Sequence, residues 1–99
     1  MKNTEKQILE KTKKVLKDLK GDYYNEKDIV KVMFHEDDEV ARPKGTILNS
    51  WVISIDAIFD NRDFLIISDE TGEPLYYQNF NMIIAEIEKN SEGKYVIKK

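Results

Sequence analysis

The sequence predicts an α+β fold: an antiparallel sheet of about four strands, with an N-terminal amphipathic helix and a shorter C-terminal helix packed on one face. Three observations lead to it. Apolar residues recur at helical spacing near the N-terminus, they form short extended runs joined by polar turns in the middle, and they return to helical spacing near the C-terminus. With 99 residues, 40% of them apolar, the chain is expected to form one folded domain over residues 1–99.

The first helix is expected from Thr4 to Lys20. Thr4 followed by Gln7 has the spacing of a capping box, and Gly21 stands where a left-handed residue commonly ends a helix. Lysines cover one face of this helix. The other face gathers the apolar residues Ile8, Leu9, Val15, Leu16 and Leu19.

Extended segments are expected in the middle of the chain, because their apolar residues form short runs or alternate with polar ones. Asn49–Phe59 shows the clearest alternation, with Trp51, Ile53, Ile55, Ala57 and Phe59 on one face. Pro74 favours an edge position for its strand, since proline donates no backbone hydrogen bond. The predicted strands are Asp28–His35, Asn49–Phe59, Phe64–Ser68, Pro74–Tyr77 and a short last one at Tyr95–Ile97.

Polar segments and one further helix complete the expected order. Residues 36–45 are predicted to form a surface loop, and residues 60–63 a turn. Asp69–Gly72 is a second tight connection, in which Gly72 can adopt a positive φ. Phe80–Ile87 has helical spacing, with Asn79 or Asn81 as its cap.

Charge is unevenly distributed along the chain. Residues 1–20 hold seven lysines and three acidic residues, a net charge of +4, whereas residues 21–99 hold nine basic and sixteen acidic residues, a net charge of −7. An acidic surface repels nucleic acid and anionic membranes and speeds encounter with basic proteins. The expected partner is therefore a basic protein, and neither a nucleic acid nor a membrane.

The absence of cysteine and of long apolar stretches bears on location. Small secreted domains often depend on disulfides, so a cysteine-free chain favours a reducing compartment. No segment has the length and apolar character of a membrane span or a signal-peptide core. A cytoplasmic protein is expected.

The residues that carry catalysis or bind metals are few. His35 is the only histidine, so an enzyme that needs an imidazole would have to use it. Without cysteines or further histidines a standard zinc site is excluded, and residues 36–39 lack the alternating spacing of a calcium loop. Scattered glycines exclude a phosphate-binding loop. We expect no enzyme activity, no cofactor and no metal.

Acidic residues and one tyrosine are therefore the candidate partner-binding residues. The acidic run and the turn acids could meet a basic surface. Tyr76 and Tyr77 fall on opposite faces of their strand, so one of them is expected to be exposed, on a possible edge strand. The candidate set is Glu36, Asp37, Asp38, Glu39, Asp60, Asp63 and Tyr76.

Three segments carry a resemblance to a known family. They are Trp51-Val52-Ile53-Ser54, the run Phe64–Glu73 with its Asp-Glu-Thr-Gly turn, and Phe80–Ile87. In this order, after an amphipathic helix, they resemble the YrhB-like small immunity proteins of bacterial polymorphic toxin systems. The resemblance implies a cytoplasmic antidote that binds a cognate toxin domain and blocks its active site or substrate groove. The hairpin at Phe64–Glu73 also resembles PepSY-like domains.

Three functional hypotheses remain open at this point. The first is an immunity or inhibitor protein that neutralises a toxin domain without catalysis. The second is a general chaperone-like or assembly module that uses an exposed sheet face or edge. The third is an enzyme that depends on His35.

Overall fold

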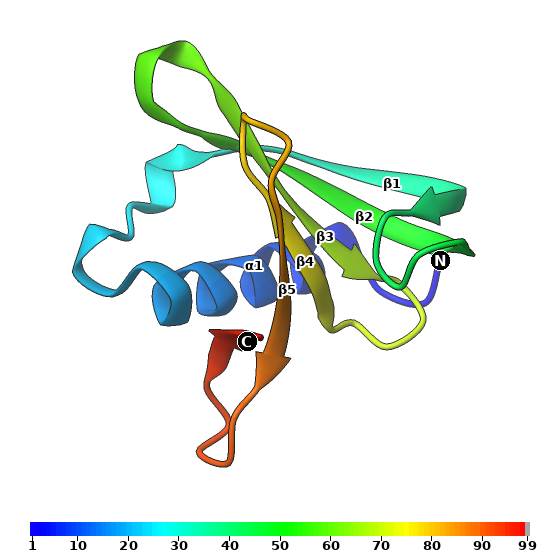
Figure 1. Ribbon diagram of the computed structural model, residues 1–99. Coiled ribbons are helices and arrows are strands. Elements are labelled where there is room, and N and C mark those ends of the chain that lie inside the picture. Colours follow the sequence, from blue (N-terminus) through cyan, green and yellow to red (C-terminus); the bar gives the residue numbers. More distant parts are fainter. Residues whose placement is uncertain (99) are drawn as a thin grey trace.

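The computed structural model describes residues 1–98, in which one long helix crosses one face of an antiparallel sheet (Figure 1). The sheet has six strands in the order β1-β2-β3-β4-β5-β6, so that every strand pairs with its neighbour in sequence. Three short 3₁₀ helices lie in the connections. The elements are α1 (Glu5–Lys20), η1 (Gly21–Tyr23), η2 (Glu26–Asp28), β1 (Ile29–Val40), β2 (Thr46–Asp56), η3 (Ile58–Asp60), β3 (Arg62–Ser68), β4 (Pro74–Gln78), β5 (Ile84–Lys89) and β6 (Tyr95–Ile97).

The α+β prediction is confirmed, and the N-terminal helix is where the sequence placed it. The Thr4 hydroxyl accepts from the Gln7 backbone N–H and the Gln7 side chain accepts from the Thr4 N–H, which completes the capping box. Gly21 follows with φ 56° and closes the helix on Lys17. The prediction of about four strands and a shorter C-terminal helix is wrong: the sheet has six strands and α1 is the only α-helix in residues 1–98.

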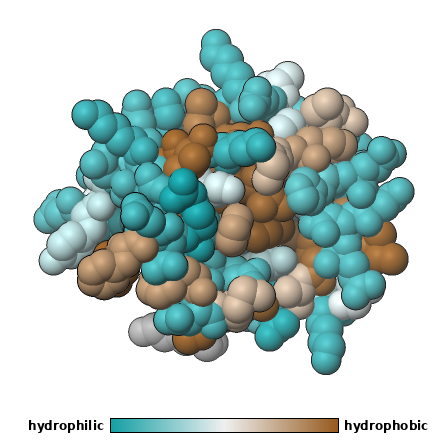
Figure 2. All heavy atoms as spheres, turned by 90° about the horizontal axis from the view of Figure 1, so that it is seen from above, coloured by the Kyte–Doolittle hydropathy of each residue, from teal (hydrophilic) through white to brown (hydrophobic). Residues whose placement is uncertain are grey.

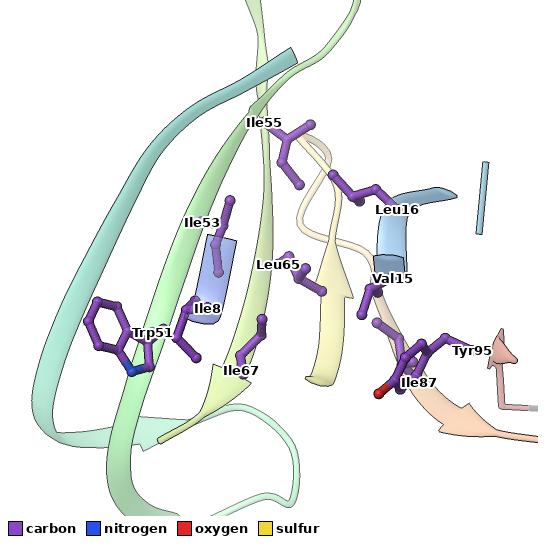
Figure 3. Close-up of a cluster of buried hydrophobic side chains, with 10 residues drawn as sticks. All are labelled: Ile8, Val15, Leu16, Trp51, Ile53, Ile55, Leu65, Ile67, Ile87 and Tyr95. Atoms are coloured by element: carbon purple, nitrogen blue, oxygen red, sulfur yellow. The ribbon is translucent and has the colours of Figure 1, made fainter. Parts of the chain in front are cut away.

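The main core lies between α1 and the central strands (Figure 3). Helical spacing turns Ile8, Val15 and Leu16 towards the sheet, where they are at most 1% exposed. The inward-facing residues of β2 and β3 pack against these helix residues. Phe34 of β1 packs its ring edge-on against Trp51, with ring centroids 5.2 Å apart. The buried residues of this cluster are Ile8, Val15, Leu16, Trp51, Ile53, Ile55, Leu65, Ile67, Ile87 and Tyr95.

The acidic run at residues 36–39 lies in a strand, and the prediction of a surface loop there is wrong. β1 continues to Val40, with a bulge between His35 and Asp38 where Asp37 has φ 50°. Beyond the bulge Val40 is 2% exposed and pairs with Thr46, so burial of an apolar residue keeps the strand in the sheet. The turn to β2 is confined to residues 41–45.

The segment predicted as a C-terminal helix forms a hairpin. The Asn79 side-chain oxygen accepts hydrogen bonds from the backbone of Asn81 and Ile83, and Met82 has φ 65°. A left-handed residue stops a right-handed helix, so the chain turns and β5 pairs with β4. The sequence predicts Asn79 or Asn81 as the cap of a helix; in the structure the Asn79 side chain stabilises a turn through the same chemistry.

Two smaller strand predictions also need correction. β2 ends at Asp56, so Ala57 and Phe59 do not continue its buried face, and Phe59 is 89% exposed. Pro74 does not mark an edge, because β4 lies between β3 and β5. It is tolerated as the first residue of β4, beside a register shift in β3.

A second apolar cluster lies on the sheet face opposite α1. Tyr76 is central to it: its hydroxyl accepts a hydrogen bond from the Ala41 N–H at 3.1 Å, which holds the end of the β1–β2 hairpin over the sheet. Val40, Ile66 and Tyr76 are buried there, and Ala41, Leu48, Val52, Phe64, Leu75 and Ile84 pack against them while staying partly exposed.

A buried carboxylate fixes the N-terminal segment to the sheet. Asp69 is 1% exposed and accepts hydrogen bonds from the Lys2 N–H at 2.7 Å, the Asn3 N–H at 3.0 Å and the Trp51 indole N–H at 2.8 Å. Burial alone would raise the pKa of Asp69, but these hydrogen bonds outweigh burial and hold the pKa below its ordinary value of 3.8.

We predict that Asp69→Ala lowers the free energy of unfolding by about 2–3 kcal/mol at neutral pH, because the buried indole N–H of Trp51 and two part-buried backbone N–H groups lose their acceptor. Since the pKa is lower in the folded state, this stabilisation is complete above the ordinary pKa and lost as the pH falls through the folded-state value. Urea unfolding of both proteins between neutral pH and about pH 2 tests this. The exposed neighbour is the control: Glu70→Ala should change stability by less than about 1 kcal/mol.

Candidate functional site

Large apolar side chains are exposed on two loops at one end of the sheet. One loop joins β2 to β3 through η3, and the other joins β4 to β5; both rise at the top of Figure 1. Isolated exposed apolar residues are ordinary, but a group of them on neighbouring loops indicates an interaction surface. We call this group the tip surface; its members and their exposed fractions are Ile58 (64%), Phe59 (89%), Phe80 (37%), Met82 (73%) and Ile83 (62%).

The backbone of these loops holds the apolar side chains outward. Phe59 and Asp60 have φ of 57° and 62°, values that residues with a side chain rarely adopt. The loop is closed by the Ala57 N–H, which donates to the Asn61 carbonyl at 2.9 Å, and by the Asn61 N–H, which donates to the Ile58 carbonyl at 3.2 Å. Backbone strain of this kind is concentrated at functional sites.

Asp63 connects the two loops. Asp63 is the second residue of β3, directly after the β2–β3 loop, and is 9% exposed. It accepts hydrogen bonds from the Phe80 N–H at 2.9 Å and the Tyr77 hydroxyl at 2.5 Å. Burial and this carboxylate raise the pKa of Tyr77 well above its ordinary value, so the tyrosine remains a hydrogen-bond donor at any physiological pH.

A cleft of about 490 Å³ lies between the two loops, with Ile58 on one side and Phe80 on the other. Lys20, Asp28, Asp56, Ala57 and Asp63 complete its lining. Figure 2 views the molecule from above Figure 1 and shows hydrophobic side chains gathered around a hollow in the middle of that face, with hydrophilic ones along its borders.

The predicted acidic candidates divide by exposure. Glu36, Asp37 and Glu39 are exposed on β1, whereas Asp38 is half-buried and accepts a hydrogen bond from the Ser50 hydroxyl at 2.7 Å. Asp60 is exposed on the tip loop. The structure thus leaves three carboxylates of the run free to act on a partner over distance, and uses Asp38 within the sheet.

Two of the predicted candidates are internal. Asp63 lies in β3 and not in a surface turn, and its carboxylate is occupied by Phe80 and Tyr77. Tyr76 is 5% exposed, because the β1–β2 hairpin covers it, and Tyr77 on the opposite face is half-buried. The expectation of one exposed tyrosine on this strand is wrong.

The tip residues Phe59, Met82 and Ile83 were missed by the sequence interpretation, because their spacing assigned them to a strand face and a helix. The signal that could have located them is the turn chemistry beside them: Asp60-Asn61 in one loop and Asn79 with Asn81 in the other. Apolar residues inside such polar turns cannot enter a core formed by the flanking strands.

His35 lies on the part of β1 that precedes the acidic run. His35 is exposed on β1, and no hydrogen bond joins its side chain to another described residue. Within residues 1–98, no group of three or more histidine, cysteine, aspartate or glutamate side chains is placed to hold a metal ion. In the same part of the chain, no helix has both the length and the apolar character needed to cross a membrane.

Another polar cluster is formed around Tyr95 and Glu73, and its groups form hydrogen bonds and ion pairs with one another. The Tyr95 hydroxyl donates to the Glu73 carboxylate and accepts from the Lys11 ammonium at 2.9 Å, while Lys89 lies over the ring at 5.1 Å. Burial together with this carboxylate raises the pKa of Tyr95 to about 12. The cluster joins α1 to β5 and β6, which explains it structurally.

Comparisons with protein-family models, with curated proteins and with solved structures found no match.

We predict that Asp63→Asn loosens the β4–β5 loop and leaves the rest of the sheet intact, because Phe80 and Tyr77 donate to different oxygens of the carboxylate and asparagine has only one acceptor oxygen, which is also neutral. Amide hydrogen exchange at Phe80 should accelerate about tenfold, which corresponds to about 1.4 kcal/mol. Asp60→Asn is the matched control, since this exposed carboxylate makes no such bond to the loop. Unchanged exchange at Phe80 in Asp63→Asn would contradict this role.

Proposed function

We propose that this protein is an inhibitor of the immunity type, which inserts its tip surface into an apolar cleft of a basic partner protein and neutralises that partner by occlusion, without catalysis. The observation that carries the proposal is the outward display of five large apolar side chains on two adjacent loops. Buried aromatic and methionine anchors at the centre of an interface commonly supply most of its binding free energy.

The loops are suited to tight binding because their conformation is already fixed. Backbone hydrogen bonds close the β2–β3 loop, the Asn79 side chain closes the β4–β5 loop, and Asp63 joins the second loop to the first. A preorganised surface loses less conformational entropy on binding than a mobile loop does. Phe59 and Met82 can therefore act as rigid anchors.

Charge supports a basic partner. Residues 21–99 carry a net charge of −7, and exposed carboxylates lie both on β1 and, at Asp60, within the tip loop itself. Opposite charge accelerates association over distances of about a Debye length, whereas desolvated apolar contacts mainly slow dissociation. The acidic sheet and the apolar tips thus serve different steps of the same binding reaction.

A chaperone-like or assembly module is a second candidate function, and the partly exposed apolar face around Phe64 and Ile84 favours it. The two functions differ in stoichiometry and affinity. An inhibitor forms a tight complex with one partner, whereas a chaperone binds many unfolded clients weakly.

The direct test uses the protein encoded beside this chain's gene. We expect that protein to arrest growth when expressed alone in a bacterial host, and growth to be restored when this chain is co-expressed. A neighbour that is harmless, or toxic in the presence of this chain as well, would contradict the inhibitor proposal.

In that complex, we predict that Phe59→Ser and Met82→Ser each accelerate dissociation at least about tenfold, since each removes an apolar anchor. Surface plasmon resonance measures the rate, and thermal unfolding should remain near that of the unchanged protein because both side chains are exposed. Ile47→Ser is the matched control: Ile47 is 63% exposed at the opposite end of β2. Equal effects from all three variants would argue against the tip surface.

Neutralising the acidic run tests the steering role. We predict that the combined variant Glu36→Gln, Asp37→Asn and Glu39→Gln, which keeps Asp38 and its bond to Ser50, associates more slowly with the basic partner and loses much of the salt dependence of its association rate, with dissociation little changed. Stopped-flow measurements between low and high salt resolve the two rates. An unchanged association rate with unchanged salt dependence would show that the acidic run does not steer the partner.

A further inference from the structure

β1 leaves one side of its backbone unpaired. It is the first strand in the sheet order and pairs with β2 alone, and Figure 1 shows no other element of residues 1–98 beside its outer edge. Proteins commonly keep edge strands short, and the opposite edge conforms, since β6 has three residues. β1 has twelve, and between its two register shifts the residues Lys31–His35 form a regular edge that can pair with an added strand.

A groove runs along the α1 side of this edge. It has a volume of about 590 Å³ and lies between the N-terminal segment and β1. Val32, Phe34 and Trp51 form its apolar side, and residues 1–5 form the other wall. Volumes of this size accommodate several side chains or a small ligand.

The wall of the groove is held in place. Asp69 binds the backbone of Lys2 and Asn3 and the indole of Trp51, so one carboxylate positions both sides. A fixed groove beside an unpaired edge is the arrangement that proteins use to bind an extended peptide: the edge supplies backbone hydrogen bonds and the groove takes alternate side chains.

The negative charge at the end of β1 determines which extended segments can pair with this strand. Glu36, Asp37 and Glu39 are exposed on the same strand, immediately beyond the groove residue Phe34. Three negative charges repel an acidic strand and attract a basic one, which also protects the edge from unselective pairing. In an antiparallel arrangement, the N-terminal end of the added strand lies beside these carboxylates.

We propose that β1 binds an extended segment of a partner protein as an additional antiparallel strand, with basic residues at its N-terminal end beside Glu36–Glu39 and alternate apolar side chains in the groove. The groove and the tip surface share no residue, so peptide binding in the groove can fail while the inhibitor function stands, and the reverse; the exposed carboxylates Glu36, Asp37 and Glu39 are common to both proposals.

The probe is a short acetylated and amidated peptide with two lysines followed by alternating valine and threonine. Trp51 is the only tryptophan and lines the groove, so its fluorescence reports occupancy. We expect a saturable change in fluorescence, and slower hydrogen exchange of backbone amides in Lys31–His35. A peptide with glutamates in place of the lysines should bind at least about tenfold more weakly.

Two measurements separate strand pairing from unspecific attraction. One peptide is N-methylated on its odd-numbered residues and a second on its even-numbered residues. Only one of the two should lose binding, because only every second backbone N–H of the added strand faces β1. In Glu36→Lys with Glu39→Lys, residues 36–39 change from a net charge of −4 to 0, so the preference for lysine over glutamate peptides should be lost; both residues are exposed, so folding is preserved.

Several results would overturn the proposal. They are equal binding of both methylated peptides, an unchanged charge preference in the double variant, or no fluorescence change at millimolar peptide. Sedimentation showing a dimer of this chain at micromolar concentration that Glu36→Lys with Glu39→Lys dissociates would also overturn it, because the edge would then be occupied by a second copy.

Discussion

The position of the N-terminal segment depends on one carboxylate. Asp69 sits at the end of β3 and gathers two backbone N–H groups from residues 2 and 3 together with the indole of Trp51. Three donors make its burial favourable, and they fix where α1 begins to cross the sheet. The wall of the groove and the orientation of the tryptophan, which is itself part of the core, are fixed by this contact.

The apolar residues that form the core and those that are exposed lie in different parts of the fold. One sheet face is covered by α1, and the other is partly covered by the end of the β1–β2 hairpin, which Tyr76 holds through the Ala41 N–H. The apolar residues that neither cover protects are concentrated at the β2–β3 and β4–β5 loops. Carboxylates that are buried, Asp63 and Asp69, position backbone, while those that are exposed shape the field around the sheet.

The sequence correctly predicted the features that depend only on neighbouring residues, such as helix ends, strand alternation and tight turns. The capping box at Thr4, the end of α1 at Gly21, the alternation of Trp51, Ile53 and Ile55, and the turn at Gly72 all form as expected. Long-range constraints decided the rest. Phe80–Ile87 has helical spacing, yet pairing with β4 makes it a turn and a strand; residues 36–39 have loop composition, yet burial of Val40 keeps them in β1. The candidate site was missed for the same reason, since the sequence pattern places Phe59 on the face of a longer strand and Met82 within a helix, and the chain forms neither.

The pairing of each strand with its neighbour in sequence also bears on how quickly the chain can fold. Hairpins close short loops, so the sheet can assemble from local contacts, and topologies of this kind fold faster than sheets whose strands must find distant partners. The contact of residue 2 with residue 69 joins positions 67 residues apart, with α1 and β1–β3 between them, so its loop-closure entropy exceeds that of the hairpins.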